Sequence, residues 1–200
     1  MIIVGAVEKI IEMAQENNGI VTTAMVVAAG FSRGNIKYLV DKGMIEKSAR
    51  GVYILPEVWD DEIFNLQNRF QRGIYSHETA LFLWDLTDRT PNRYHMTFPV
   101  NYNLTKPKQE NIRCIQCKKA LYDMGIAEVT TPGGNTVKAY SVERTLCDIL
   151  RPHSHVDIQV VTEAFKHFIT RADKNIPILS EYAKILKVET RLRSYLEVLL

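Results

Sequence analysis

The chain has 200 residues, 46% of them hydrophobic, and a formal net charge of +2 from 25 Lys or Arg and 23 Asp or Glu. This length suits one or two domains, and the mild charge excludes a histone-like or polybasic chain, so DNA binding would need a local basic patch. Three cysteines, an odd number, argue against a disulfide framework and favour a reducing compartment.

Residues 2–17 are predicted to form an amphipathic helix. Val7, Ile10 and Ala14 share one face at helical spacing, and an Asn-Asn-Gly sequence at 17–19 ends the helix. Glutamates interrupt the apolar stripe, and neither a basic start nor a cleavage site of a signal peptide is present. No run approaches the roughly 18 apolar residues of a membrane span. We therefore expect a cytoplasmic protein that does not enter a membrane.

The next stretch has the pattern of two helices joined by a tight turn. Thr22 or Thr23 can cap a short helix over residues 24–29, because its side-chain oxygen can accept from a first-turn N–H. Gly30 permits the sharp exit that a helix end needs. Ser32 then caps a second helix. Three apolar residues of this second helix are spaced to face inward: Ile36, Leu39 and Val40.

A small hairpin is predicted to follow the second helix. Its strands are the runs Met44 to Lys47 and Val52 to Leu55, joined by residues 48–51 and closed by Pro56. Helix, turn, helix and hairpin together predict a winged helix-turn-helix over residues 1–56. In that geometry the second helix lies in the major groove of DNA, with its N-terminal residues at the base edges.

The charges of this domain are polarised. Residues 31–51 contain five Lys or Arg against two acids, whereas residues 1–30 contain one Lys against three Glu. Arg can pair with guanine and Asn with adenine, and Lys neutralises phosphate. The alternative is a winged-helix adaptor that binds proteins, with charges that only solvate its surface. We predict DNA contacts at Ser32, Arg33, Asn35, Lys37, Tyr38, Lys42, Lys47 and Arg50.

Residues 57–74 are predicted to be a linker with a helix, because an acidic, turn-prone run precedes Ile63, Leu66 and Phe70 at helical spacing. A second domain is expected over residues 75–200. Its pattern predicts a mixed α/β domain with a small sheet and a helical C-terminus, so the expected fold class of the chain is α+β. Strands are predicted at 94–98, 111–116, 125–131 and 136–140, and helices at 76–84, 142–150, 157–171, 178–186 and 189–199.

The last two helices and the joint between them form a second basic cluster. We interpret it as a secondary nucleic-acid contact, made by Lys184, Lys187, Arg191 and Arg193.

Arg144 and Asp148 are four residues apart in a predicted helix, so one helix face can bring them together. They form either an ion pair on the helix surface or a buried pair that braces the second domain or serves a site there. We favour a structural role.

The residues that could carry chemistry do not complete a recognisable site. Cys114 and Cys117 form a lone CxxC motif without the further ligands that zinc needs, and His153 and His155 lie in a polar loop. No nucleophile elbow, HExxH or Walker pattern is present. We therefore expect no enzyme, no metal and no cofactor. A redox or nucleic-acid-processing activity at the two cysteines is the enzymatic alternative.

These features together resemble the AbiEi family, the antitoxins of the AbiE abortive-infection, type IV toxin–antitoxin systems of bacteria. Beside the winged helix, the resemblance rests on the sequences YSHETAL at 75–81, YHMTFP at 94–99 and VERTLCDIL at 142–150, and it covers essentially the whole chain. It implies a winged helix that represses its own operon at inverted repeats in double-stranded promoter DNA. It also implies that residues 75–200 are an antitoxin domain countering a nucleotidyltransferase-like toxin without a stable complex.

A physical constraint bears on how such a protein would bind an operator. A single winged helix with few phosphate contacts binds DNA weakly at physiological salt. Useful repression then needs two molecules on paired half-sites. We therefore expect a monomer in solution that binds its operator cooperatively.

Overall fold

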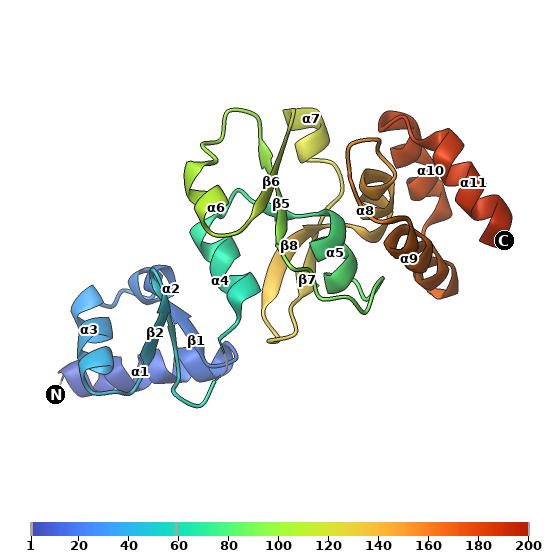
Figure 1. Cartoon of the computed structure of the whole chain (residues 1–200). Coiled ribbons are helices and arrows are strands. Elements are labelled where there is room, and N and C mark those ends of the chain that lie inside the picture. The colour runs from blue at the N-terminus through green and yellow to red at the C-terminus, as the bar shows by residue number, and fades with distance from the viewer. Residues whose placement is uncertain (1, 59, 200) are drawn as a thin grey trace. The chain divides into compact units, whose positions relative to one another are not determined.

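The computed structural model divides into two compact units (Figure 1). The first unit runs to Arg69 and also includes residues 130–137, and the second comprises Phe70–Val129 and the chain from Lys138 onward. The structure describes residues 2–58 and 60–199, with only the backbone for residues 2–4 and 198–199. The ends of the predicted domains at residues 1 and 200, and residue 59 of the predicted linker, lie outside the described residues.

The first unit combines helices with a short antiparallel sheet of strand order β1-β3-β2. Its predicted helices and hairpin are all present. In chain order the elements are α1 (Ile2–Glu16), β1 (Ile20–Thr22), α2 (Thr23–Ala28), α3 (Arg33–Asp41), β2 (Glu46–Ala49), β3 (Val52–Ile54) and α4 (Glu62–Arg69).

The sheet differs from the prediction in two details. Strand β1 was not expected, because three residues are too few to show a β pattern, and it pairs antiparallel with β3. Strand β2 begins two residues later than predicted and runs on to Ala49, with a register shift between Lys47 and Ala49. The hairpin turn is therefore shorter than expected. Gly51 adopts the positive φ that the turn requires, +79°.

The core of the first unit lies between its first three helices. Val7, Ile10 and Ala14 of α1 are buried in one cluster with residues of α2 and α3, so the predicted amphipathic face of α1 is confirmed. Ile36 and Leu39 are fully buried members of this cluster, while Val40 is half-buried at its edge. The inward side of α3 is therefore narrow, and most of the helix surface is left free.

Helix α4 is held within the first unit by polar contacts. Asp61 accepts the N–H of Phe64 at 3.0 Å, which caps the helix. Its other carboxylate oxygen accepts from the Thr131 hydroxyl and, at 2.8 Å, from the Asn135 amide. The turn at residues 130–137 is thus joined to this unit by a buried carboxylate, and also by the Asn18 amide, which donates to the Gly134 carbonyl at 2.7 Å.

The second unit combines a mixed sheet with helices, as expected, and the fold class α+β is confirmed. The sheet has the strand order β6-β5-β4-β8-β7. Strand β5 is antiparallel to β4 and parallel to β6, and β4 is parallel to β8. The strands are β4 (Ile74–Tyr75), β5 (His95–Pro99), β6 (Arg113–Cys117), β7 (Ile126–Thr130) and β8 (Thr136–Tyr140).

Helices flank this sheet and form the C-terminal part of the unit (Figure 1). The two-residue strand β4 and the short helices α6 and α7 were not predicted, because so few residues carry no readable period. The main core lies among α5 and α8 to α11, around Leu146, Phe165 and Leu179. The helices are α5 (His77–Leu83), α6 (Thr105–Gln109), α7 (Lys119–Tyr122), α8 (Val142–Ile149), α9 (Ile158–Thr170), α10 (Ile176–Ile185) and α11 (Glu189–Leu199).

Arg144 is the polar centre of the second unit. Its side chain is 1% exposed, and its Nε donates to Asp148 Oδ2 at 2.9 Å. Its Nη1 donates to the carbonyls of Leu121 at 2.6 Å and Met124 at 2.8 Å, and the guanidinium lies 4.2 Å from the centre of the Tyr140 ring. The expected structural role is confirmed, because this one side chain joins α8 to the end of α7 and to β8.

Replacing Arg144 by Met should strongly destabilise the second unit, because Asp148 and two carbonyls would remain buried without their donor. We expect a loss of about 3–5 kcal/mol in the free energy of unfolding, measured by urea denaturation. The matched control is Arg89→Met, which removes a 54% exposed partner of Glu163 and should cost less than about 1 kcal/mol. Equal losses in the two variants would contradict the bracing role.

Candidate nucleic-acid interface

Side-chain caps set the positions of the two helices of the helix-turn-helix. Thr22 Oγ1 accepts the N–H of Met25 at 3.2 Å, so Thr22 rather than Thr23 caps α2. Ser32 Oγ accepts the N–H of Gly34 at 3.1 Å and caps α3, as predicted. Gly30, with a φ of +82°, makes the turn between them. These caps fix which residues lie in the first turn of α3.

The outward face of α3 carries charge and one large aromatic ring. Arg33 and Lys37 are exposed, and the Tyr38 ring is 43% exposed. The ammonium of Lys42 lies 5.8 Å from the centre of that ring. One acid, Asp41, is exposed on the same helix. The face is therefore basic at its N-terminal end and mixed at its C-terminal end.

Asn35 is less exposed than the other predicted contacts. It is half-buried and lines a hollow together with Gly5 and Lys9 of α1 and with Phe31. Ser32, which is exposed, lines the same hollow.

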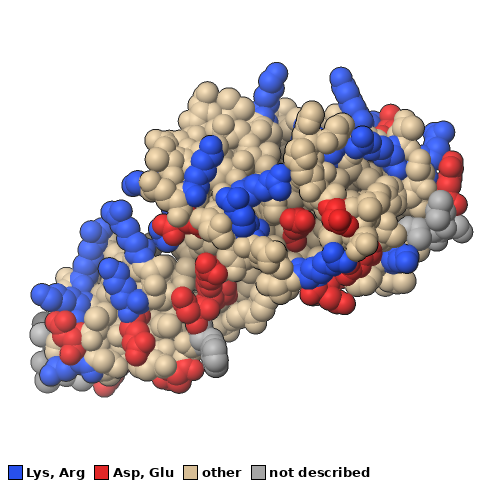
Figure 2. Space-filling model, viewed as in Figure 1, with Lys and Arg blue, Asp and Glu red and all other residues tan. Residues whose placement is uncertain are grey.

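The hairpin carries the two remaining predicted contacts. Lys47 in β2 and Arg50 in the turn are both exposed. The Gly51 carbonyl accepts the N–H of Thr23 at 2.9 Å, which joins the hairpin turn to the start of α2. Figure 2 shows Lys and Arg side chains standing out from the first unit where α3 lies, with Asp and Glu among them.

The second basic cluster is exposed but partly occupied in structural contacts. Lys184, Lys187 and Arg193 are exposed on α10, α11 and the joint between them. Arg191 is also exposed, yet its Nη1 donates to the Leu150 carbonyl at 2.7 Å. Among the described residues, the side chains of the other three cations make no hydrogen bond or ion pair.

The CxxC residues lie on a strand rather than at the start of a helix. Cys114 and Cys117 are both in β6, three positions apart, so their side chains point to opposite faces of the sheet. Burial raises the pKa of both thiols, which opposes thiolate formation. Cys147 is buried, and its pKa is raised to about 12 by the same cause.

His153 and His155 are exposed, as their loop position suggested. Within the described residues, no cluster of three or more His, Cys, Asp or Glu side chains is arranged to hold a metal ion. None of the helices in the described part of the chain has the length and hydropathy of a membrane span.

Residues 8–56 match the model of a family of transcriptional regulators described as AbiEi antitoxins. The match falls on the winged helix, so the inferred resemblance to the AbiEi family is confirmed for residues 8–56. In this region the chain is similar to DNA-binding regulators of transcription that serve as antitoxins in abortive infection.

One solved structure is similar in fold over almost the whole chain. The RV2827C protein from Mycobacterium tuberculosis superposes with a TM-score of 0.54 at 15% sequence identity, covering 96% of this chain and 81% of that one. At this identity the likeness shows the fold alone. Comparison with curated protein sequences gives no match.

Cys114 and Cys117 should not form a disulfide in the folded protein. Residues three apart on a strand are separated by about 10 Å, beyond the reach of a disulfide. After diamide treatment of the native chain and removal of the diamide, the chain is unfolded in urea and alkylated, and its intact mass should show both thiols alkylated. The control is the same treatment in urea, where the bond can form. A disulfide formed under native conditions would instead favour the redox alternative.

Proposed function

We propose that this protein is the autorepressor and antitoxin of a bacterial toxin–antitoxin operon of the abortive-infection type. It binds inverted repeats in its own promoter through the winged helix and acts without catalysis. The observation that carries the proposal is that the family match at residues 8–56 coincides with a capped helix whose N-terminal end presents exposed cations.

In this proposal α3 enters the major groove and the hairpin lies over the backbone or the minor groove. Arg33 is placed to read a base edge from the first turn of the helix, and Lys37 and Lys42 neutralise phosphates. Ser32 and Tyr38 lie beside them. Asn35, half-buried in the same part of the helix, completes the base contacts. Lys47 and Arg50 supply the hairpin's contacts.

The second unit is proposed to be the antitoxin domain. It counters a nucleotidyltransferase-like toxin without forming a stable complex, as the AbiEi resemblance implies. The basic residues of α10 and α11 are proposed to add a nucleic-acid contact, with Lys184, Lys187 and Arg193 freer to do so than Arg191.

An adaptor role is the second candidate, and the composition of the first unit's surface favours it. Val27 is 47% exposed, Tyr38 43% and Met44 40%. Apolar side chains among exposed charges also suit a protein partner. Binding to the operator decides between the two roles.

Replacing Arg33 and Lys37 together by Ala should abolish specific operator binding, because it removes a base contact and a phosphate contact from one helix. In gel-shift titrations with DNA from directly upstream of the gene, we expect affinity to fall about 10- to 100-fold or more. The salt dependence of the remaining binding should also weaken.

The control for this experiment is Lys119→Ala with Lys166→Ala, which removes the same charge from exposed positions in the second unit. It should bind as the parent chain does. Absence of any specific shift with the parent chain, in excess competitor DNA and at two salt concentrations, would favour the adaptor.

We also expect a monomer in solution that occupies paired half-sites in steps. Sedimentation equilibrium without DNA should give the mass of one chain, and titration of a two-site operator should show cooperative filling. In an operator with one half-site destroyed, the remaining half-site should bind its molecule more weakly than the same half-site does in the intact operator. A tight dimer without DNA would contradict the monomer, and independent filling would contradict cooperativity.

A further inference from the structure

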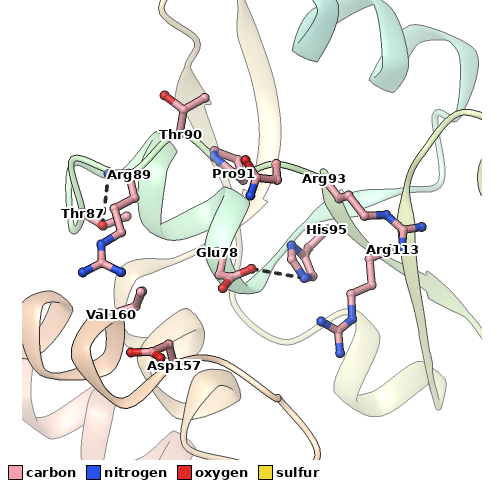
Figure 3. Close-up of a pocket in the computed structure, with 11 residues that line it drawn as sticks. Glu78, Thr87, Arg89, Thr90, Pro91, Arg93, His95, Arg113, Asp157 and Val160 are labelled. Carbon is pink, nitrogen blue, oxygen red and sulfur yellow. Dashed lines mark hydrogen bonds and ion pairs between the residues drawn. The ribbon is translucent and has the colours of Figure 1, made fainter.

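The second unit contains a pocket of about 430 Å³ that shares no residue with the winged helix (Figure 3). It is bounded by α5, by the segment at 87–93, by the paired strands β5 and β6, and by the start of α9. A volume of this order is typical of small-molecule sites. The charged or titratable residues that line it are Glu78, Arg89, Arg93, His95, Arg113 and Asp157.

Two arginines of this pocket lack the carboxylate partners that Arg89, Arg144 and Arg151 have. The Arg93 side chain donates only at 3.5 Å, to the Asn111 carbonyl, and the Arg113 side chain has no ion pair or hydrogen bond among the described residues. By contrast, Arg144 and Arg151 lie against Asp148, and Arg89 lies against Glu163. The guanidinium groups of Arg93 and Arg113 are therefore not engaged by a carboxylate of the described residues.

These arginines lie beside a buried imidazole. His95 in β5 is the register partner of Arg113 in the parallel strand β6, so their side chains stand on the same face of the sheet. Arg93 is two residues before His95. Figure 3 shows Arg93 and Arg113 on the same side of the His95 ring, and Glu78 on another.

His95 is 3% exposed, and neither ring nitrogen has a well-formed hydrogen bond among the described residues. Glu78 Oε2 lies 3.5 Å from Nε2, at the limit of such a bond. The His77 ring stacks on the imidazole, with centroids 5.9 Å apart. Buried polar atoms without partners are rare in folded proteins, so these nitrogens point to a missing ligand.

The electrostatic setting favours an anion. The pKa of His95 is lowered to about 3, mainly by burial and then by the neighbouring His77, Arg113 and Arg93. The imidazole is thus neutral, with the cations Arg93 and Arg113 on one side and the Glu78 carboxylate on another. An anion at Arg93 and Arg113 would neutralise these two cations and give the ring nitrogens a polar neighbour.

We propose that this pocket binds a small phosphate monoester, held by Arg93 and Arg113 with His95 beside it. A guanidinium group can donate two parallel hydrogen bonds to two phosphate oxygens. Two arginines also supply the two positive charges that balance a phosphate dianion. Glu78 and Asp157 reduce the lining to three cations against two acids, unlike the continuous basic groove that holds a nucleic-acid strand. The same two acids can accept hydrogen bonds from ligand hydroxyls, as on a sugar.

The test is calorimetric titration of the full chain with inorganic phosphate, adenosine 5′-monophosphate and adenosine, followed by NMR of the His95 ring. We expect phosphate and the monophosphate to bind and to shift the His95 resonances, and adenosine to do neither. Arg113→Ala and Arg93→Ala should each weaken binding about tenfold or more. The affinity of Arg113→Lys should fall between those of the parent chain and Arg113→Ala, because lysine keeps the charge but lacks the two-point contact of a guanidinium.

The matched control is Arg72→Ala, which removes an exposed arginine that stacks on Tyr102 and does not line the pocket. It should bind as the parent chain does. Any of three results would overturn the proposal. The first is an affinity for adenosine or for acetate equal to that for phosphate, the second is an unchanged phosphate affinity in Arg113→Ala, and the third is absence of binding at millimolar ligand. Each variant is first compared with the parent chain by thermal unfolding, and Arg113→Lys replaces any variant that is unfolded.

Two oligonucleotides separate the sources of the monoester. A single strand with a 5′-phosphate that binds better than the same strand with a 5′-hydroxyl would identify a nucleic-acid end, whereas binding of the mononucleotide alone would identify a free nucleotide. Both results support the pocket. Operator binding through α3 should be unchanged in Arg113→Ala, so failure of one proposal leaves the other testable.

Discussion

The second unit depends on the way in which one buried arginine is neutralised. Burying a guanidinium is costly unless each donor finds a partner. Arg144 has a carboxylate, two carbonyls and an aromatic face, drawn from α8, the end of α7 and β8. Burial raises the pKa of Asp148, and the Arg144 charge counteracts it. Residues far apart in the sequence are thus held at one point, and the sheet that carries the pocket is held with them.

The first unit solves a different problem, namely how to leave a helix accessible. Only Ile36 and Leu39 of α3 are fully buried, so the helix is attached along a narrow strip. Caps at Thr22 and Ser32 compensate, because they satisfy N–H groups that packing leaves unpaired. The hydrogen bond from Thr23 to Gly51 then fixes the hairpin against the same helices. Accessibility and rigidity come from separate interactions.

These differences explain what could be predicted from sequence. The winged helix follows from local signals, since caps, turns and helical spacing each involve residues within one segment. The Arg144–Asp148 pair was predictable for the same reason, at four residues' spacing. Strand β1 was missed because its three residues gain their structure only by pairing with β3. Which residues contact DNA remains a prediction, although Asn35 shows that helical spacing alone does not give exposure.

The pocket could not have been predicted, because its residues meet only after the sheet forms. His77 and Glu78 are adjacent in sequence. In the structure they act on a third residue, since His77 stacks on the His95 ring and Glu78 approaches its Nε2. Arg113 arrives through the parallel pairing of β5 with β6, a long-range register that no local pattern encodes.

The cations of α3 and the hairpin differ from Arg113 of the pocket in their exposure to solvent. The charges of α3 and the hairpin are exposed, so salt screens them over a Debye length of about 8 Å at physiological ionic strength. In the pocket Arg93 is exposed as well, but Arg113 is half-buried beside a buried imidazole, where screening is weaker. Raising salt should therefore release DNA well before it releases a phosphate monoester from the pocket. A ligand in the second unit could persist under conditions that leave the winged helix free, which makes the pocket suited to a signal separate from operator binding.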